Sequence, residues 1–184
     1  MPNKPKILNS SLISKTRIFR IEELELEFSN GTRVHYERLK GAAYGAVIVV
    51  PMRDDNTVLM IKEYAAGTHR YELALPKGRI EKQEDRLNAA NRELMEEIGY
   101  GARRLTHLCS LSIAPGYIDS CTDVVLAQDL YRRRLEGDEP EEIEIVPWRL
   151  DQLHKLLDRE DFSEARSIAA MYIARDLLAK QRDS

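Results

Sequence analysis

The sequence predicts an α/β protein, a three-layer α/β/α sandwich with a mixed sheet, preceded by an antiparallel β segment. Residues 1–42 carry strand patterns, strand patterns flank a central helical pattern between residues 46 and 128, and two more helical patterns end the chain. Strands interleaved with helices favour a sheet that helices cover on both faces. We therefore expect a β-rich segment over residues 1–42 and a main domain over residues 43–184.

Composition excludes several classes of protein. Of the 184 residues, 43% are hydrophobic and 32% are charged, which is an ordinary globular profile. The net charge of -3 argues against generic nucleic-acid binding. No apolar run approaches the length of a membrane span, and the N-terminus lacks a signal-peptide core. These observations predict a cytoplasmic protein with neither nucleic acid nor membrane as partner.

The first 42 residues predict a β-hairpin. Residues Leu24 to Phe28 alternate apolar and polar side chains, Ser29 to Thr32 reads as a tight turn, and Val34 to Leu39 reads as the returning strand. An isolated hairpin is only marginally stable in water. This segment therefore needs a surface to pack on, either in its own domain or on a partner chain.

The strands of the main domain begin with Ala46–Pro51, a continuous apolar run that predicts a strand buried on both faces. Further strands follow at residues 58–64, 71–73, 105–111, 124–128 and 143–148. A short helix is predicted over residues 149–157, and a longer amphipathic one over residues 163–180.

The central helix is predicted over residues 84–98, which contain neither Pro nor Gly, with Gly99 at the position of a C-terminal cap. At roughly 100° per residue, three glutamates share one arc of the helix. They are Glu93, Glu96 and Glu97. Apolar side chains that can pack on a sheet fill the adjoining arc.

Like charges at this spacing destabilise a helix, so something must offset their repulsion. Oxygen ligands on a rigid element suit a hard divalent cation, Mg²⁺ or else Mn²⁺. Arg92 and Glu84 can hold the carboxylates in place around it. The alternative is a solvated acidic helix face, which is common.

The wider pattern resembles the signature of the Nudix hydrolases. It reads Gly, five residues, Glu, seven residues, then Arg-Glu-apolar-x-Glu-Glu-x-Gly, and the fixed positions here are Gly78, Glu84, Arg92, Glu93, Leu94, Glu96, Glu97 and Gly99. Tyr100 departs from it, because the family usually has an aliphatic residue there. The resemblance implies the Nudix fold and metal-dependent hydrolysis of a nucleoside diphosphate linked to another moiety.

The resemblance also implies roles for individual residues. Glu93 and Glu97 would bind the metal, and Glu96 would be a further ligand or orient the attacking water. Arg92 would orient Glu93. In relatives that cleave ADP-ribose, the backbone carbonyl before the first motif glycine also binds metal, which here is that of Lys77.

Features outside the motif bear on the substrate. Pro115 lies sixteen residues after Gly99, where ADP-ribose-cleaving relatives typically carry a proline, although a simple turn would look the same. The acidic stretch around Glu139 and Glu141 resembles the loop whose glutamate orients the attacking water in those relatives, and a solvated charge run is the alternative. Arg70 and Glu72 flank the predicted site and are candidates for substrate binding.

Nearly the whole chain resembles the NudE type, the ADP compounds hydrolases within the ADP-ribose pyrophosphatase-like group. The sequence segments that carry this resemblance include residues 27–31, 88–94, 127–131 and 135–140. It implies ADP-ribose, diadenosine triphosphate and NADH as substrates, AMP as a shared product, and a homodimer whose N-terminal segments help to build an adenosine pocket. Alternatives are a Nudix enzyme for another nucleoside-diphosphate sugar or dinucleoside polyphosphate, and a non-catalytic Nudix ligand sensor.

Overall fold

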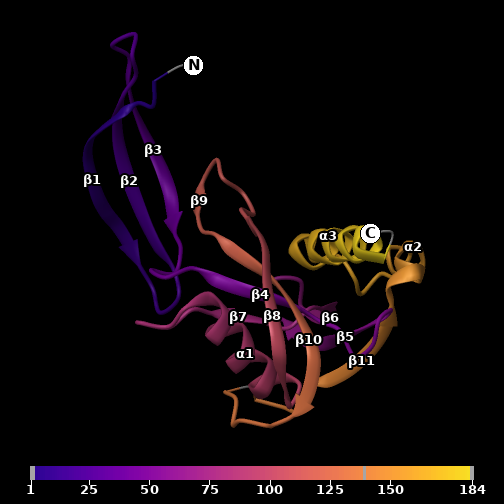
Figure 1. The fold of residues 1–184 in the computed structure, drawn as a ribbon. Helices are drawn as coiled ribbons and strands as arrows, with labels where there is room; N and C mark the ends of the chain where they lie inside the picture. Colours follow the sequence, from indigo (N-terminus) through magenta and orange to yellow (C-terminus); the bar gives the residue numbers. More distant parts are fainter. Residues whose placement is uncertain (1–2, 139, 183–184) are drawn as a thin grey trace. The chain divides into compact units, whose positions relative to one another are not determined.

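The structure is a computed structural model that describes residues 3–138 and 140–182. The chain divides into two compact units (Figure 1). The N-terminal unit contains the described residues up to 43 together with residues 112–121, and the main unit contains residues 44–111 and those from 122 onward. Residues 112–121 therefore group with the N-terminal strands, which the sequence pattern does not indicate.

The N-terminal unit is one sheet with the strand order β1-β2-β3-β9. The predicted hairpin is confirmed, because β2 (Arg20–Glu27) pairs antiparallel with β3 (Arg33–Lys40) through a turn in which Gly31 has a φ of 81°. Such a positive φ favours glycine. The edge strand β1 spans Lys6–Lys15, and β9 (Ile118–Asp119) pairs parallel with β3.

The main unit contains two sheets. The first has the order β7-β4-β10-β8, in which only the central pair β4–β10 is parallel, so it is a mixed sheet. The second has the order β11-β5-β6 and is antiparallel. The strands are β4 (Ala46–Pro51), β5 (Thr57–Ala65), β6 (Arg70–Ala74), β7 (Lys77–Arg79), β8 (Tyr100–Leu111), β10 (Thr122–Arg132) and β11 (Glu144–Arg149).

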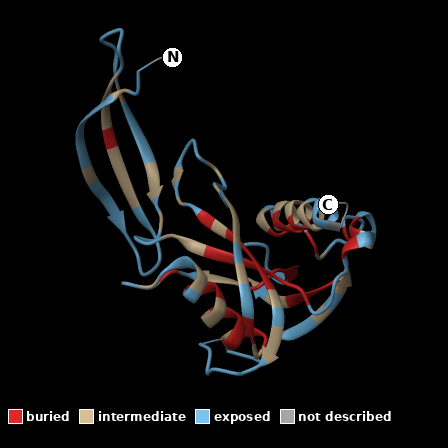
Figure 2. Ribbon diagram, viewed as in Figure 1, coloured by how far each residue is buried: buried red, intermediate tan, exposed pale blue. Residues whose placement is uncertain are grey.

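Helices cover both faces of this arrangement, as predicted (Figures 1 and 2). Helix α1 (Arg86–Glu97) packs in one apolar cluster with Val47 and Val49, and helix α3 (Ala165–Arg182) packs in another with Ile48 and Val50. Successive residues of β4 thus enter opposite clusters, which confirms that this strand is buried on both faces.

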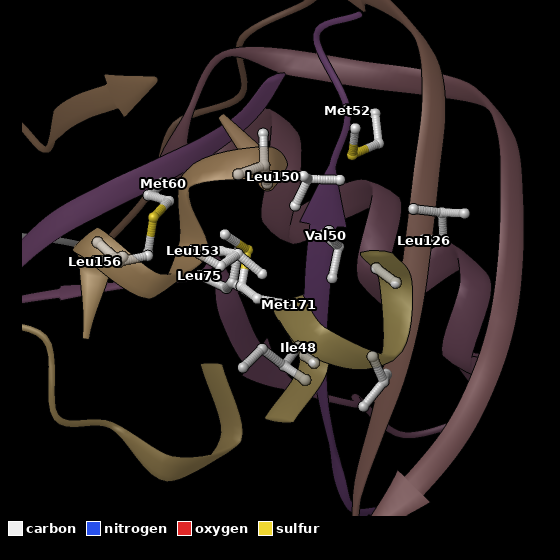
Figure 3. Packing of buried hydrophobic residues seen from close by; sticks show 14 of the residues in the cluster. Ile48, Val50, Met52, Met60, Leu75, Leu126, Leu150, Leu153, Leu156 and Met171 are labelled. Carbon is white, nitrogen blue, oxygen red and sulfur yellow. The ribbon is translucent and has the colours of Figure 1, made fainter. Parts of the chain in front are cut away.

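The cluster on the α3 side also receives the segment between β11 and α3. That segment contains a 3₁₀ turn, η1 (Leu150–Gln152), and the short helix α2 (Leu153–Leu156). Figure 3 shows Leu150, Leu153 and Leu156 pointing into the cluster with Met171 of α3. In the described part of the chain, no helix is both long and apolar enough to cross a membrane.

Several predicted element boundaries were wrong. The central helix begins at Arg86, because the side chain of Asp85 caps it, and the helix predicted over residues 149–157 is η1 followed by α2. Strands β7 and β9 have only three and two residues, and their pairing with distant strands defines them. A pattern of so few residues does not distinguish a strand from a loop.

Candidate functional site

Helix α1 is fixed at both ends and on one face. Asp85 Oδ1 accepts hydrogen bonds from the backbone N–H groups of Leu87 and Asn88, at 2.9 and 3.0 Å, an arrangement that satisfies otherwise unpaired donors at a helix start. At the other end, Gly99 has a φ of 71°, as expected for a left-handed cap. Leu94 is fully buried against the sheet. The glutamates next to it are therefore held in a defined direction.

Glu93 and Glu97 point into the protein, and only 8% and 7% of their surfaces are exposed. Glu93 lies against strand β7. A Cβ atom added at Gly78 would lie 1.9 Å from Glu93 Cδ and about as close to both carboxylate oxygens. The glycine of the motif is therefore required because the strand passes directly over the Glu93 carboxylate, where any side chain would collide with it.

Arg92 connects the carboxylates of the motif. Its Nη1 donates to Glu93 Oε1 at 2.8 Å and to Glu96 Oε2 at 2.9 Å, and its Nε donates to Glu84 Oε1 at 3.0 Å. Nη2 donates to Glu84 Oε2 at 3.1 Å and to the carbonyl oxygen of Arg79 on β7 at 2.8 Å. Burial disfavours the charged guanidinium, but Glu84 and Glu93 outweigh that effect and raise the pKa of Arg92 above its ordinary value.

Glu97 is held by Lys77. The Lys77 backbone N–H donates to Glu97 Oε2 at 3.1 Å, while Lys77 Nζ donates to Glu63 Oε2 at 2.8 Å. Burial raises the pKa of Glu97 to about 8, with the charges of Glu93 and Glu63 adding to it and Lys77 opposing it. Burial likewise raises the pKa of Glu93, against the opposing effect of Arg92.

The predicted cluster of three carboxylates is not preformed. Among the described residues, no group of three or more His, Cys, Asp or Glu side chains is arranged to hold a metal ion as it stands. Glu93 and Glu97 both lie against β7, and Glu93 and Glu96 both accept from Arg92 Nη1, while the Glu96 backbone lies beside Gly137. The donors nevertheless fit a hard cation, since they are oxygens only, and burial raises the pKa of both Glu93 and Glu97, so a bound cation would stabilise their charged forms.

The acidic loop starts beside the end of α1. Leu135 N–H donates to the Met95 carbonyl oxygen at 3.0 Å, which anchors the start of this loop on the helix. Glu139 lies outside the described residues. Glu141 is exposed and accepts a hydrogen bond from the Tyr71 hydroxyl at 2.7 Å, and this bond is the main reason why the pKa of Tyr71 is raised.

Arg70 and Glu72, the predicted substrate-binding residues on β6, are paired with each other. Arg70 Nε donates to Glu72 Oε1 at 2.7 Å. Ser163, which precedes α3, joins them by accepting from Arg70 Nη2 at 3.1 Å and donating to Glu72 Oε1 at 3.2 Å. No sequence signal indicates Ser163, because it lies 91 residues from Glu72 and the two meet only in the folded chain.

Pro115 belongs to the N-terminal unit, where it lines a pocket of about 480 Å³. Aromatic side chains of Phe28, Tyr36 and Tyr117 line the same pocket, and all three are substantially exposed. Ser120 also lines it, and its buried hydroxyl has no hydrogen-bond partner in the described residues. The sequence pattern allows Tyr36 either a ligand contact or sheet packing and does not indicate Phe28 or Tyr117, because their clustering depends on the 112–121 segment joining the N-terminal sheet.

Comparison with known proteins places this geometry in a family. The model of the NudE-type Nudix hydrolase N-terminal domain matches residues 5–38, and that of the NUDIX domain matches residues 43–171. The chain is 48% identical over 178 residues to ADP compounds hydrolase NudE of Escherichia coli (strain K12), covering 97% of this chain and 95% of that protein. It is 31% identical over 173 residues to an ADP-ribose pyrophosphatase of Bacillus subtilis (strain 168), covering 90% and 92%.

A solved structure agrees. A crystal structure of an ADP compounds hydrolase matches with a TM-score of 0.91 and 46% sequence identity, and the match covers 98% of this chain and 97% of that one. The similarity therefore extends over both units and is not confined to the motif.

Proposed function

The chain belongs to the Nudix hydrolases, of the NudE type, and from that premise we propose that it hydrolyses the pyrophosphate bond of ADP-linked compounds and releases AMP. The observation that carries this proposal is the pair of buried carboxylates, Glu93 and Glu97, held against β7 by Gly78 and Lys77. Two acidic side chains of raised pKa beside a strand backbone form a site for a cation and for the phosphates that it binds.

Glu93, Glu97, Glu96 and the Lys77 carbonyl would hold a divalent cation, Mg²⁺ or Mn²⁺. When bound, it polarises phosphoryl oxygens, offsets the negative charge of the diphosphate and lowers the pKa of a water molecule. Burial raises the pKa of Glu97 to about 8 in the metal-free protein, and a bound cation would favour its carboxylate form. Arg92 keeps Glu93 and Glu96 oriented through its two bonds from Nη1.

The reaction is attack of water on one phosphorus of the P–O–P bridge. The new P–O bond comes from water, the bond from that phosphorus to the bridging oxygen breaks, and the bridging oxygen leaves on the other phosphate. The water proton passes to a carboxylate, for which the acidic loop supplies Glu139 and Glu141. With ADP-ribose the products are AMP and ribose 5-phosphate.

The adenosine moiety is proposed to bind in the pocket of the N-terminal unit. Its aromatic lining, Phe28, Tyr36 and Tyr117, suits stacking on a purine, and Pro115 borders the same space. Arg70 and Glu72 are proposed to contact the substrate at the main unit, where a bound phosphate would compete with Glu72 for the Arg70 guanidinium.

We also propose that the protein is a homodimer built through the N-terminal unit. Strand β1 forms an edge of its sheet and exposes two pairs of apolar side chains, Ile7 with Leu8 and Leu12 with Ile13. About half of the surface of Ile7, Leu12 and Ile13 is exposed, and the turn after the strand adds Ile18 and Phe19. Apolar surface of this extent on one element favours burial by a second copy.

Product analysis tests the activity. The protein is incubated with ADP-ribose, NADH, NAD⁺ and diadenosine polyphosphates, with Mg²⁺ or Mn²⁺, and the products are separated by HPLC. AMP should appear from ADP-linked substrates, and no product should form when the cation is chelated. Inertness toward every ADP-linked compound, together with cleavage of another nucleoside-diphosphate sugar, would refute the proposal, and binding without cleavage would indicate a ligand sensor.

The loop carboxylates lead to a separate prediction. Glu139→Gln and Glu141→Gln are each compared with the unaltered protein, and at least one should lower kcat by about 100-fold while KM changes by less than about threefold, the range of a lost general base. Tyr71→Phe is the control: it removes the hydroxyl that donates to Glu141 but keeps the Glu141 carboxylate itself, so kcat should fall far less than in the glutamine variants. Unchanged kcat in both glutamine variants would assign activation of the water to the helix carboxylates.

A further inference from the structure

An ion pair outside the Nudix motif joins the two sheets of the main unit. Glu63 belongs to β5 in the β11-β5-β6 sheet, and Lys77 belongs to β7 in the β7-β4-β10-β8 sheet. Glu63 Oε2 accepts from Lys77 Nζ at 2.8 Å, and the two side chains are 30% and 24% exposed. An ion pair this well shielded is held more firmly than a solvent-exposed one.

The strand that this ion pair anchors is short and lies at a sheet edge. Strand β7 has three residues, and its ladder to β4 consists of three residue pairs. Its own backbone nevertheless positions both buried carboxylates, because the Lys77 N–H binds Glu97 and Gly78 lies over Glu93. A small displacement of β7 would therefore move the partners of both glutamates at once.

We propose that Glu63 is a positioning residue for the reaction. By holding the Lys77 ammonium, it fixes β7 against β5, and it thereby keeps Glu97 and Glu93 in the arrangement that receives the divalent cation. The inference rests on the proposed function, because that function requires a divalent cation at this site. It assigns a role to a residue that lies fifteen positions before the first glycine of the motif.

A positioning role and a purely electrostatic role predict opposite changes in cation affinity when the Lys77 ammonium is removed. If Glu63 and Lys77 acted only through their charges, removal of the carboxylate would weaken cation binding, and removal of the ammonium would strengthen it a few-fold. If they act by holding β7, removal of either one frees the strand, and both changes weaken cation binding. The Lys77 variant therefore separates the two explanations.

The experiment is a calorimetric titration of the metal-free protein with Mn²⁺ and no substrate. Glu63→Gln and Lys77→Met should each raise the Kd for Mn²⁺ about tenfold. The Kd of the double variant should not exceed that of the weaker-binding single variant, because the two residues act as one unit. Lys77→Arg preserves the ion pair, so its Kd should stay within about threefold of that of the unaltered protein. Lys62→Met is the matched control, since the neighbouring Lys62 pairs with Asp161 and should leave Kd unchanged.

The outcomes separate the inference from the proposed function. Tighter or unchanged Mn²⁺ binding by Lys77→Met overturns the inference, and so do additive losses in the double variant. A lowered Tm of the metal-free variants with an unchanged Kd also overturns it, because the ion pair would then be structural only. Protein that binds Mn²⁺ with the expected variant pattern but cleaves no ADP-linked compound would refute the proposed function alone, and protein that binds no Mn²⁺ would overturn both.

Discussion

Replacement of Glu97 by Gln is expected to abolish metal-dependent hydrolysis while making the metal-free protein more stable at pH 8.5. The amide has nearly the same shape and can still accept the hydrogen bond from the Lys77 N–H, but it is a poor ligand for a hard cation. We expect kcat/KM to fall by at least about 1,000-fold, the scale of losing metal-assisted catalysis. Retention of near-normal activity would remove Glu97 from the site.

The gain in stability follows from linkage. The pKa of Glu97 is about 8 in the folded protein against an ordinary 4.5, so the folded state binds more protons than the unfolded one between these values. The free energy of unfolding of the unaltered protein must therefore decrease as the pH rises from about 5 to about 8, on the order of a few kcal/mol. The Gln side chain of the Glu97→Gln variant cannot ionise, so the variant should lack this decrease.

Urea unfolding in EDTA, between pH 5.5 and 8.5, measures the difference. The two proteins should have similar free energies of unfolding near pH 5.5, and the variant should be the more stable one at pH 8.5. If the free energies of unfolding of the two proteins changed with pH in parallel, ionisation of the buried Glu97 carboxylate would not destabilise the fold, and the expected stability gain would be refuted.

Replacement of Gly78 by Ala is expected to remove cation binding with little effect on folding. The new Cβ would lie within about 2 Å of the Glu93 carboxylate. That carboxylate is the far end of a flexible side chain, so it can move aside, and the free energy of unfolding should change by no more than about 1 to 2 kcal/mol. The displaced Glu93 would lose its bond with Arg92 and its direction toward the site.

We expect kcat/KM for ADP-ribose to fall at least about 100-fold in this variant, because misplacement by an ångström has effects of that size. Gly67→Ala is the matched control, since a Cβ there meets no atom within 4 Å. Steady-state kinetics and urea unfolding are measured on both variants. A Gly78 variant with normal turnover would show that the close approach of β7 to Glu93 is dispensable.

Local sequence patterns predicted the central helix and the buried strand β4 well. The phase of the glutamates on α1 depends only on residues three and four apart, and the burial of Ala46–Pro51 follows from a continuous apolar run. The NudE-type resemblance and the α/β fold were likewise confirmed. The roles of the site residues remain predictions, and Glu139 lies outside the described residues.

By itself, then, the sequence determined the fold class, the family and the helix that carries the carboxylates, because each of these is written in neighbouring residues or in a fixed spacing. Only the tertiary structure decided that Glu97 is buried with a pKa of about 8, that Glu63 reaches Lys77, and that Ser163 joins Arg70. Those contacts connect residues from separate strands and loops. Their energies depend on burial and on partners that come together only when the chain packs, so no local pattern encodes them.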